Sequence, residues 1–450
     1  MDTARPGQDE AQRVLDLTLA VGEVLLAGGV GAAAVTDVCT AVARAGGLRR
    51  VECDITFTSI ALSAVPAGGS TPVSAIRLVH AGELDHTRVT GVHVLVEDFV
   101  AGRIPLSAAE ERFSRVTAAP SPYRRPVVTC ARAVLAASVA VLLGAGPVVT
   151  GAAFGATVVI DVVNARLGRA GLPPFFLNVT GGLLATAVAL ALVAAEAGVR
   201  PALVVAGGIV LLLPGVTLVG AVQDAITGFY VTAAARALET VLLTAGIVSG
   251  IAVALAVGVR LGLPVRIVDP PAAQLGRVVA EVLAAAVVAT AFALANRAPA
   301  RALPAVAALG AGGWGLSLSI TRLELPAVLA AASAAVAIGA AGHLLAGWQR
   351  MPTVVHTVAG VVPLLPGLTI YRGMRHLAEG DDLGGMELLG SAVTTGLALA
   401  AGLILGELVV RLARRRPLRP PGWRRGARRA GAASAGRGRA RLPGSDRSAT

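Results

Sequence analysis

Long apolar runs constrain this chain more than any other feature. From Val127 onward, runs of about 18–25 apolar residues follow one another with short polar gaps, and each could cross the roughly 30 Å hydrocarbon layer of a bilayer. The chain is 55% hydrophobic with a mean hydropathy of +0.74, more than the cores of a soluble protein of 450 residues could hide. The sequence therefore predicts an all-α polytopic membrane protein with about ten transmembrane helices. We place these spans at roughly 127–145, 147–165, 174–195, 202–222, 233–259, 278–296, 303–320, 326–346, 353–371 and 388–412.

Two of these runs contain the same interruption. "LLPGVTLVG" begins at Leu212 and "LLPGLTIYRG" at Leu364, so that Pro214 and Pro366 stand 152 positions apart. Proline removes a backbone donor and glycine loosens the chain, which leaves carbonyl groups of the preceding turn without partners. In lipid such a break persists only where protein or a wet cavity covers it. It is either a kink stabilised by neighbouring helices or part of a site for a small polar solute.

The interruption belongs to a longer internal repeat. Shifting the chain by 152 residues also aligns Pro147 with Pro299 and Pro174 with Pro326. Each half would then hold five spans, and because five is odd the second half must enter the bilayer upside down. An inverted 5+5 repeat with broken helices in matching positions is typical of the central site of a secondary transporter. We expect this substrate site to be formed by Pro214, Gly215, Thr217, Pro366, Gly367, Thr369 and Asn178.

Ionisable residues in apolar surroundings are the candidates for proton coupling. Asp161 lies inside the second span, Asp224 follows the first break, Glu239 is near the start of the fifth span, and His356 precedes the second break. A buried carboxylate in a membrane helix is costly and is therefore a candidate functional group. The alternatives are ion pairing of Asp161 with Arg166 or Arg169, interfacial solvation of Asp224 and Glu239, and simple packing of His356. Asn178 could instead serve as a polar contact between helices.

The remaining chain divides into an N-terminal domain and a tail. Residues 1–122 are too polar to span a bilayer and predict a small α/β domain, with one strand over "VECDITFTSIALSAV", a second over "VSAIRLVHA", and a capping box formed by Ser107 and Glu110. The membrane halves are expected at 123–260 and 261–413, and the Arg-rich segment 414–450 is expected to be disordered. All 39 basic residues are arginine, no signal peptide is expected, and the Arg distribution favours cytoplasmic placement of both termini.

Several stretches resemble the threonine/serine exporter family. They are "VGEVLLAGGVGAAAVTDVCTAVARAGGL" followed by "CDITFTSIALS", the segment "GELDHTRVTGVHVLVEDFVAGRIPLSAAEERFSRVTAAPSPY", and the two Pro-Gly helices with their flanks. The resemblance implies a cytoplasmic domain fused to ten spans in a bacterial inner membrane, with export of small amino acids driven by a proton gradient. By position it supports Pro214, Gly215, Asp224, Pro366 and Gly367, and it does not cover Asp161. Where that family commonly shows Arg-Val-Glu, this chain has Ala34, Val35, Thr36 and Asp37.

We therefore expect a proton-coupled exporter of threonine, serine or a similar small polar solute. Its partners would be that solute, protons and membrane lipids, with a homo-oligomer left open and no nucleic acid. The sequence has no Walker A, G-x-S-x-G or H-E-x-x-H motif, so we expect neither an enzyme nor a cofactor. Alternatives are an exporter of small dicarboxylates, a sensor, or a membrane-anchored enzyme acting through the N-terminal domain. The enzyme alternative would draw on Cys39, Asp54, His80, Asp85 and His86.

Overall fold

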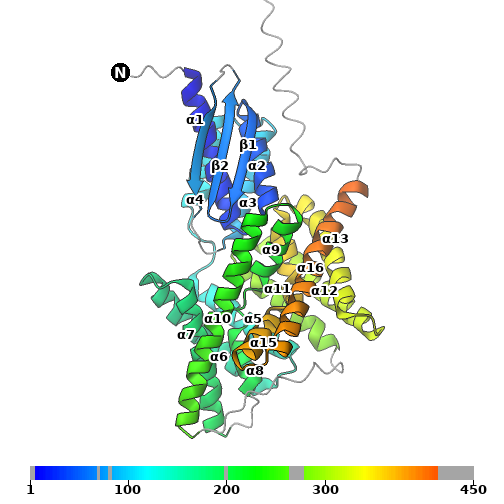
Figure 1. Cartoon of the computed structure of the whole chain (residues 1–450). Coiled ribbons are helices and arrows are strands. Elements are labelled where there is room, and N and C mark those ends of the chain that lie inside the picture. The colour runs from blue at the N-terminus through cyan, green and yellow to red at the C-terminus, as the bar shows by residue number, and fades with distance from the viewer. Residues whose placement is uncertain (1–5, 68–70, 80–83, 197–200, 263–277, 414–450) are drawn as a thin grey trace, which may run out of the picture.

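The computed structural model describes residues 6–67, 71–79, 84–196, 201–262 and 278–413. A small α/β domain at the N-terminus rests on one end of a much larger helical region (Figure 1). The tail 414–450, for which the sequence predicts disorder, lies outside the described residues.

The N-terminal domain is a three-stranded antiparallel sheet with helices packed on one face. The strand order is β1-β2-β3. Along β2 the side chains of Ile60, Leu62 and Ala64 are buried while their neighbours are not, as expected of a strand with one face turned to a core. The strands are β1 (Leu48–Thr56), β2 (Ser59–Pro66) and β3 (Val73–Leu78), and the helices are α1 (Pro6–Ala27), α2 (Ala32–Ala45), α3 (His86–Val100) and α4 (Leu106–Ala118).

Two local predictions in this domain are wrong. The single strand predicted over residues 51–65 is a hairpin, in which Thr56 pairs with Ser59 across a two-residue turn. That turn is Phe57-Thr58 and contains none of the Gly, Asn or Asp residues that usually mark such turns. The capping box does not form because α4 begins at Leu106 with Pro105 as its N-cap residue and no side-chain cap. Glu110 instead accepts a hydrogen bond of 3.0 Å from Arg13 Nε.

The helical region contains fewer complete spans than the ten expected. Within the described residues, eight helices are long and apolar enough to cross a membrane, and a pair bent by 51° at the second Pro-Gly break would make a ninth. The run predicted as one span over 202–222 is divided into two short helices by residues 210–214, and neither piece is long enough by itself. The helices of the first half are α5 (Arg125–Leu142), α6 (Pro147–Arg169), α7 (Pro174–Ala194), α8 (Pro201–Ile209), α9 (Gly215–Ile226) and α10 (Tyr230–Arg260). Those of the second are α11 (Val278–Ala295), η1 (Ala300–Ala302), α12 (Leu303–Arg322), α13 (Ala327–Gln349), α14 (Thr353–Val361), η2 (Val362–Leu364), α15 (Gly367–Ala378) and α16 (Asp382–Ala413).

The same order of elements occurs in both halves. Two long helices precede a third, a short helix then meets a Pro-Gly break, a second short helix of 12 residues follows, and a helix of 31 or 32 residues ends the half. The aligned prolines stand at equivalent places, because Pro174 begins α7 and Pro326 is the N-cap residue of α13. Proline suits these positions, where the missing N–H has no helical partner to lose.

Each half contains one pair of closely packed parallel helices. A Cβ atom at Gly250 of α10 would overlap the carbonyl oxygen of Val179 in α7, and one at Gly406 of α16 would overlap that of Val336 in α13. A second glycine lies four residues earlier in each case, at Gly246 and Gly402. Small residues at this spacing let two helix backbones approach closely, which is how membrane helices commonly associate.

The two pairs run in opposite directions. Helix α7 begins beside the N-terminal domain, since its Leu177 lines a cavity with Ser121 and Tyr123 of the linker. Helix α13 ends beside that domain, where Arg350 contacts Glu97 of α3 at 3.2 Å. Figure 1 shows the same opposition for the long helices, with α10 leaving the domain and α16 returning to its side. The contacts between halves are also reciprocal, because α5 packs on α11 while α9 packs on α16 and α10 on α15.

The N-terminal domain is docked on both halves. On the first, Thr232 Oγ1 of α10 donates a 3.2 Å hydrogen bond to the Ile55 carbonyl of β1. On the second, the His86 backbone N–H donates to the Asn296 carbonyl at 3.0 Å. In the linker that follows the domain, the Tyr123 hydroxyl donates to the Ala298 carbonyl at 2.9 Å. The soluble domain is therefore attached to the helical region at two separate patches.

Candidate functional site

The first Pro-Gly break separates α8 from α9. Helix α8 ends at Ile209, irregular turns follow, and α9 begins at Gly215 with Pro214 as N-cap residue. The first regular helical bond of α9 runs from the Leu218 N–H to the Pro214 carbonyl at 3.0 Å. No side chain caps the start of α9, so N–H groups of its first turn have no intrahelical partner.

The second break has the same form. Helix α14 passes into the 3₁₀ turn η2, and α15 begins at Gly367 after the N-cap residue Pro366, again with no side-chain cap. Its first helical bond runs from the Ile370 N–H to the Pro366 carbonyl at 3.0 Å. The start of α15 thus exposes the same kind of backbone donors as the start of α9.

The two breaks cross each other in backbone contact. A Cβ atom at Gly215 would lie 3.1 Å from the Cβ of Leu365 and 3.7 Å from the Gly367 nitrogen. A Cβ atom at Gly367 would lie 3.0 Å from the Cβ of Leu213. Leu213 and Leu365 are themselves 152 positions apart, so the contact is reciprocal: each glycine faces the leucine that precedes the other break. An alanine at either position would require the opposing leucine to shift by a few tenths of an ångström.

A cavity of about 230 Å³ lies beside the crossing. It is mostly apolar, it reaches the breaks at Gly215 and Gly367, and Trp314 is among its lining residues. The Trp314 Nε1 is buried and has no hydrogen-bond acceptor among the described residues. Thr217 and Thr369, expected to supply hydroxyls, are half-buried and are not among the lining residues.

The electrostatics of the crossing favour an anion. Each helix N-terminus carries a partial positive charge and free N–H donors. Here two such termini, those of α9 and α15, meet at one point, and a carboxylate is the group that they would bind best. The carbonyl groups that end α8 and η2 lie on the other side of the same breaks and suit an ammonium group or a hydroxyl donor.

Asp224 lies at the other end of α9 and connects it with the N-terminal domain. Its carboxylate Oδ1 accepts a 3.1 Å hydrogen bond from the backbone N–H of Ala32, the first residue of α2. Its Oδ2 lies 2.8 Å from Nη1 of Arg236 on α10, and Asp224 is only 1% exposed. A carboxylate at a helix N-terminus is favourable, and α2 has no side-chain cap of its own. Asp224 therefore caps a helix of the soluble domain from within the helical region.

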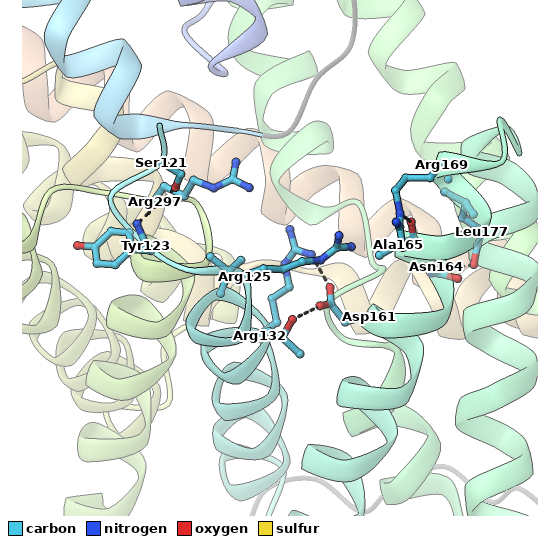
Figure 2. Close-up of a pocket in the computed structure, with 13 residues that line it drawn as sticks. Ser121, Tyr123, Arg125, Arg132, Asp161, Asn164, Ala165, Arg169, Leu177 and Arg297 are labelled. Carbon is cyan, nitrogen blue, oxygen red and sulfur yellow. Dashed lines mark hydrogen bonds and ion pairs between the residues drawn. The ribbon is translucent and has the colours of Figure 1, made fainter. Parts of the chain in front are cut away.

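Asp161 lies in a second, larger cavity on the side of the N-terminal domain (Figure 2). It is 8% exposed and forms an ion pair with Arg132 of α5, while its other oxygen accepts a hydrogen bond from the Thr129 hydroxyl. Arg166 and Arg169, the partners suggested by the sequence, instead donate to backbone carbonyls of their own helix. Arg132 is thus paired within the protein rather than extended to the interface.

Comparison with known proteins gives one consistent result. Residues 16–258 match the family model described as "Putative threonine/serine exporter", and residues 281–409 match "Threonine/Serine exporter, ThrE". The chain belongs to the threonine/serine exporter family. It is 36% identical over 407 residues to the "Probable threonine/serine exporter" of Mycobacterium tuberculosis, which covers 88% of this chain and 76% of that protein. It is 34% identical over 411 residues to the "Threonine/serine exporter" of Corynebacterium glutamicum, which covers 90% and 84% respectively. No solved structure matches the chain.

The other residues proposed for this family member lie away from the crossing. Asn178 donates from Nδ2 to the Leu243 carbonyl at 3.0 Å and so links α7 to α10. Glu239 is half-buried on α10, one turn after Arg236. His356 is fully buried in α14 and its Nε2 lies 3.0 Å from Gln349 Oε1, close to the docked domain.

The residues considered for an enzyme in the N-terminal domain have other surroundings. Cys39 is buried in the apolar core, Asp54 is exposed on β1, and Asp85 caps α3 through hydrogen bonds from Thr87 and Arg88 N–H groups. His86 is buried at the docking patch, and His80 lies outside the described residues. Among the described residues no three His, Cys, Asp or Glu side chains are grouped as a metal site would require.

Sequence reasoning did not identify three functional candidates of this exporter-family chain. Trp314 and Arg236 are not among the site residues expected from the sequence. Glu407 was also missed; it lies 3.5 Å from His343 and pairs with Arg411 near the end of α16. For Arg236 and Glu407 the available signal was a charged residue inside a predicted span, because such residues usually pair with another group of the protein.

Proposed function

We propose that the protein is a secondary exporter of small amino acids of the threonine and serine class. The substrate class rests on membership of the exporter family, whose relatives carry that name. The observation that carries the proposed site is the reciprocal crossing of the two breaks at Gly215 and Gly367. In this proposal the solute carboxylate binds at the converging N-termini of α9 and α15, and its ammonium group binds at carbonyls freed by the breaks.

The cavity beside the crossing supports a small solute. Its 230 Å³ is below the roughly 300–1,000 Å³ of pockets for drug-sized ligands. The Leu and Val side chains that line the cavity suit a methyl group. Substrate contacts by Thr217, Thr369 and Asn178 remain part of the prediction and would require movement of α9, α15 or α7 toward the cavity.

We further propose that the two halves are an inverted repeat that alternates access to this site. The matching element order, the opposite directions of the two parallel pairs and the reciprocal contacts of α9 and α15 support it. In this proposal the two halves would exchange conformations, so that the crossing opens first to the side of the N-terminal domain and then to the far side. Arg124, Arg125, Arg166, Arg169 and Arg350 lie on the domain side, which favours a cytoplasmic domain in a bacterial inner membrane.

Proton coupling is proposed for Asp161 or Asp224, with Glu239 and His356 as alternatives. Both aspartates are buried and each is paired with one arginine. A carboxylate whose arginine is drawn away in one state and restored in the other would bind a proton in the first state and release it in the second. Asp161 is the stronger candidate because it lines a cavity, whereas Asp224 is closed in by α2.

The test of the site uses the two glycines. We expect Gly215→Ala and Gly367→Ala each to abolish L-threonine counterflow in proteoliposomes, because an added methyl group displaces the opposing leucine. Gly312→Ala is the matched control, since a Cβ at that position meets nothing within 4 Å. Size-exclusion profiles would show that the variants still fold. Threonine transport by both glycine variants at the rate of Gly312→Ala would refute the proposed site.

The test of coupling uses the two aspartates. We expect one of Asp161→Asn and Asp224→Asn to lose proton-driven efflux while retaining threonine counterflow, which needs no net proton movement. Gradient-dependent transport at the wild-type level in both variants would reject both residues as proton carriers.

A further inference from the structure

The cavity around Asp161 is strongly basic. It has a volume of about 610 Å³, and its lining includes four arginines but only one carboxylate. The arginines come from the start of α5, the end of α6 and the loop after α11, so that separate parts of the fold bring their charges together (Figure 2). These residues are Arg125, Arg132, Arg169 and Arg297. Guanidinium groups are well suited to bind carboxylates, and a cavity with this excess attracts anions.

The cavity has an exposed rim and a buried floor. Arg125 and Arg169 are exposed at the rim, whereas Asp161 is 8% exposed at the floor and holds Arg132 there. Asn164 also lines the cavity, and its Nδ2 donates to the Leu177 carbonyl at 3.1 Å. An anion arriving from the side of the N-terminal domain would therefore meet Arg125 and Arg169 at the rim before it reached the ion pair.

One face of α5 connects this cavity with the cavity at the crossing. Val128 and Arg132 line the basic cavity, and Leu135, Val139 and Leu142 line the central one. These residues follow one another at spacings of four, three, four and three, which is one stripe of a helix. Arg132 and Leu135 are three residues apart, a rise of about 4.5 Å along the axis. The floor of the basic cavity thus adjoins the wall of the central cavity.

We propose that the basic cavity is the access site of the exporter, where arginine side chains bind the carboxylate of the amino acid before it moves to the crossing. This inference rests on the proposed function. Arg125 and Arg169 attract the solute, and its carboxylate then replaces Asp161 on Arg132. Release of Asp161 opens the floor between the two cavities and leaves a carboxylate that can pair with the ammonium group of the solute.

The test compares two arginines on one helix. Arg169 lines the cavity, whereas Arg166, one turn earlier on α6, is exposed outside it. In proteoliposomes of the full chain, we expect Arg169→Gln and Arg125→Gln to raise the L-threonine concentration for half-maximal transport from the domain side by about three- to tenfold, at the low end of what charge steering gives. The maximal rate from the domain side should stay unchanged, as should both parameters in Arg166→Gln.

The lipid composition separates the solute from a membrane source of the same anionic chemistry. We expect the arginine effect to be the same in purely phosphatidylcholine liposomes and in liposomes containing phosphatidylglycerol. An effect seen only with phosphatidylglycerol would mean that the cavity holds a lipid phosphate, and would overturn the proposal. Arg169→Gln behaving as Arg166→Gln would overturn it as well. If the wild type moves no threonine under any condition, the proposed function itself fails.

Discussion

Helices α9 and α15 are equivalent at their starts and different at their ends. Both have 12 residues and both begin at a Pro-Gly break in the crossing. Ten residues after each proline, α9 has Asp224, which is 1% exposed and bound to the N-terminal domain, whereas α15 has His376, which pairs with Asp381 at 2.8 Å on the far side. The crossing is therefore symmetric, but its attachment to the N-terminal domain is not. The N-terminal domain contacts the end of α9 through Asp224, whereas the end of α15 lies on the far side.

The largest difference between the two ends should come from Asp224→Ala. This change leaves Arg236 buried without its partner and removes the cap of α2, so we expect a loss of about 3–5 kcal/mol in the stability of the docked domain. Hydrogen exchange of the first amides of α2 measures it. His376→Ala, at the matching position of α15, should leave this exchange unchanged. Equal protection in Asp224→Ala and the wild type would show that the capping contact does not hold the domain.

The second docking patch should respond to acid. Burial, and secondarily the nearby His356, lower the pKa of His86 to about 4 from 6.5. The native state therefore keeps His86 neutral while the unfolded chain protonates it, so stability is full above pH 6.5 and falls as the pH approaches 4. The loss should reach about 3 kcal/mol in the free energy of unfolding at pH 4.

Denaturant titration of the full chain in detergent at several pH values checks this prediction. In His86→Gln the free energy of unfolding should decline less between pH 6.5 and pH 4, by the amount that His86 contributes in the wild type. A decline of unchanged slope in that variant would assign the acid sensitivity to other groups.

The helix pairs should behave alike in the two halves. Gly250→Ala and Gly406→Ala both force a methyl group against a carbonyl of the partner helix, and each should cost about 1–3 kcal/mol by overpacking. Thermal unfolding in detergent compares them with Gly390→Ala on α16, where a Cβ meets nothing within 4 Å. A large cost at only one of the two glycines would argue against equivalent halves.

The smallest effect is expected for an ion pair remote from both patches. Arg77 of β3 contacts Glu23 of α1 at 2.5 Å, but both side chains are partly exposed. Arg77→Ala should change the free energy of unfolding by about 1 kcal/mol or less. Compared with Asp224→Ala in the same assay, it separates the value of a buried, capping charge from that of a surface pair. A loss as large as that of Asp224→Ala would contradict this distinction.

Local patterns were enough to predict much of the fold. The apolar runs predicted a multi-pass membrane protein, and the mixed pattern before residue 122 predicted a small α/β domain. The paired prolines marked the two breaks, because proline ends a helix wherever it removes a donor. The run at 202–222 is two short helices and not one, since hydrophobicity measures the length of an apolar run and not whether it remains one helix. The hairpin at Phe57-Thr58 was not predicted because its turn contains none of the Gly, Asn or Asp residues that usually mark such turns.

The sequence by itself determined which segments are apolar, where the backbone must break, and that the break occurs twice. Only the tertiary structure decided that the breaks meet at Gly215 and Gly367, that Asp161 pairs with Arg132, and that Asp224 caps a helix of the soluble domain. In a membrane protein the lipid-facing and protein-facing sides of a helix are both apolar, so the pattern of one helix does not reveal its neighbours. Pairings between residues as distant as Ala32 and Asp224 depend on which helix faces pack together, and packing belongs to the whole chain.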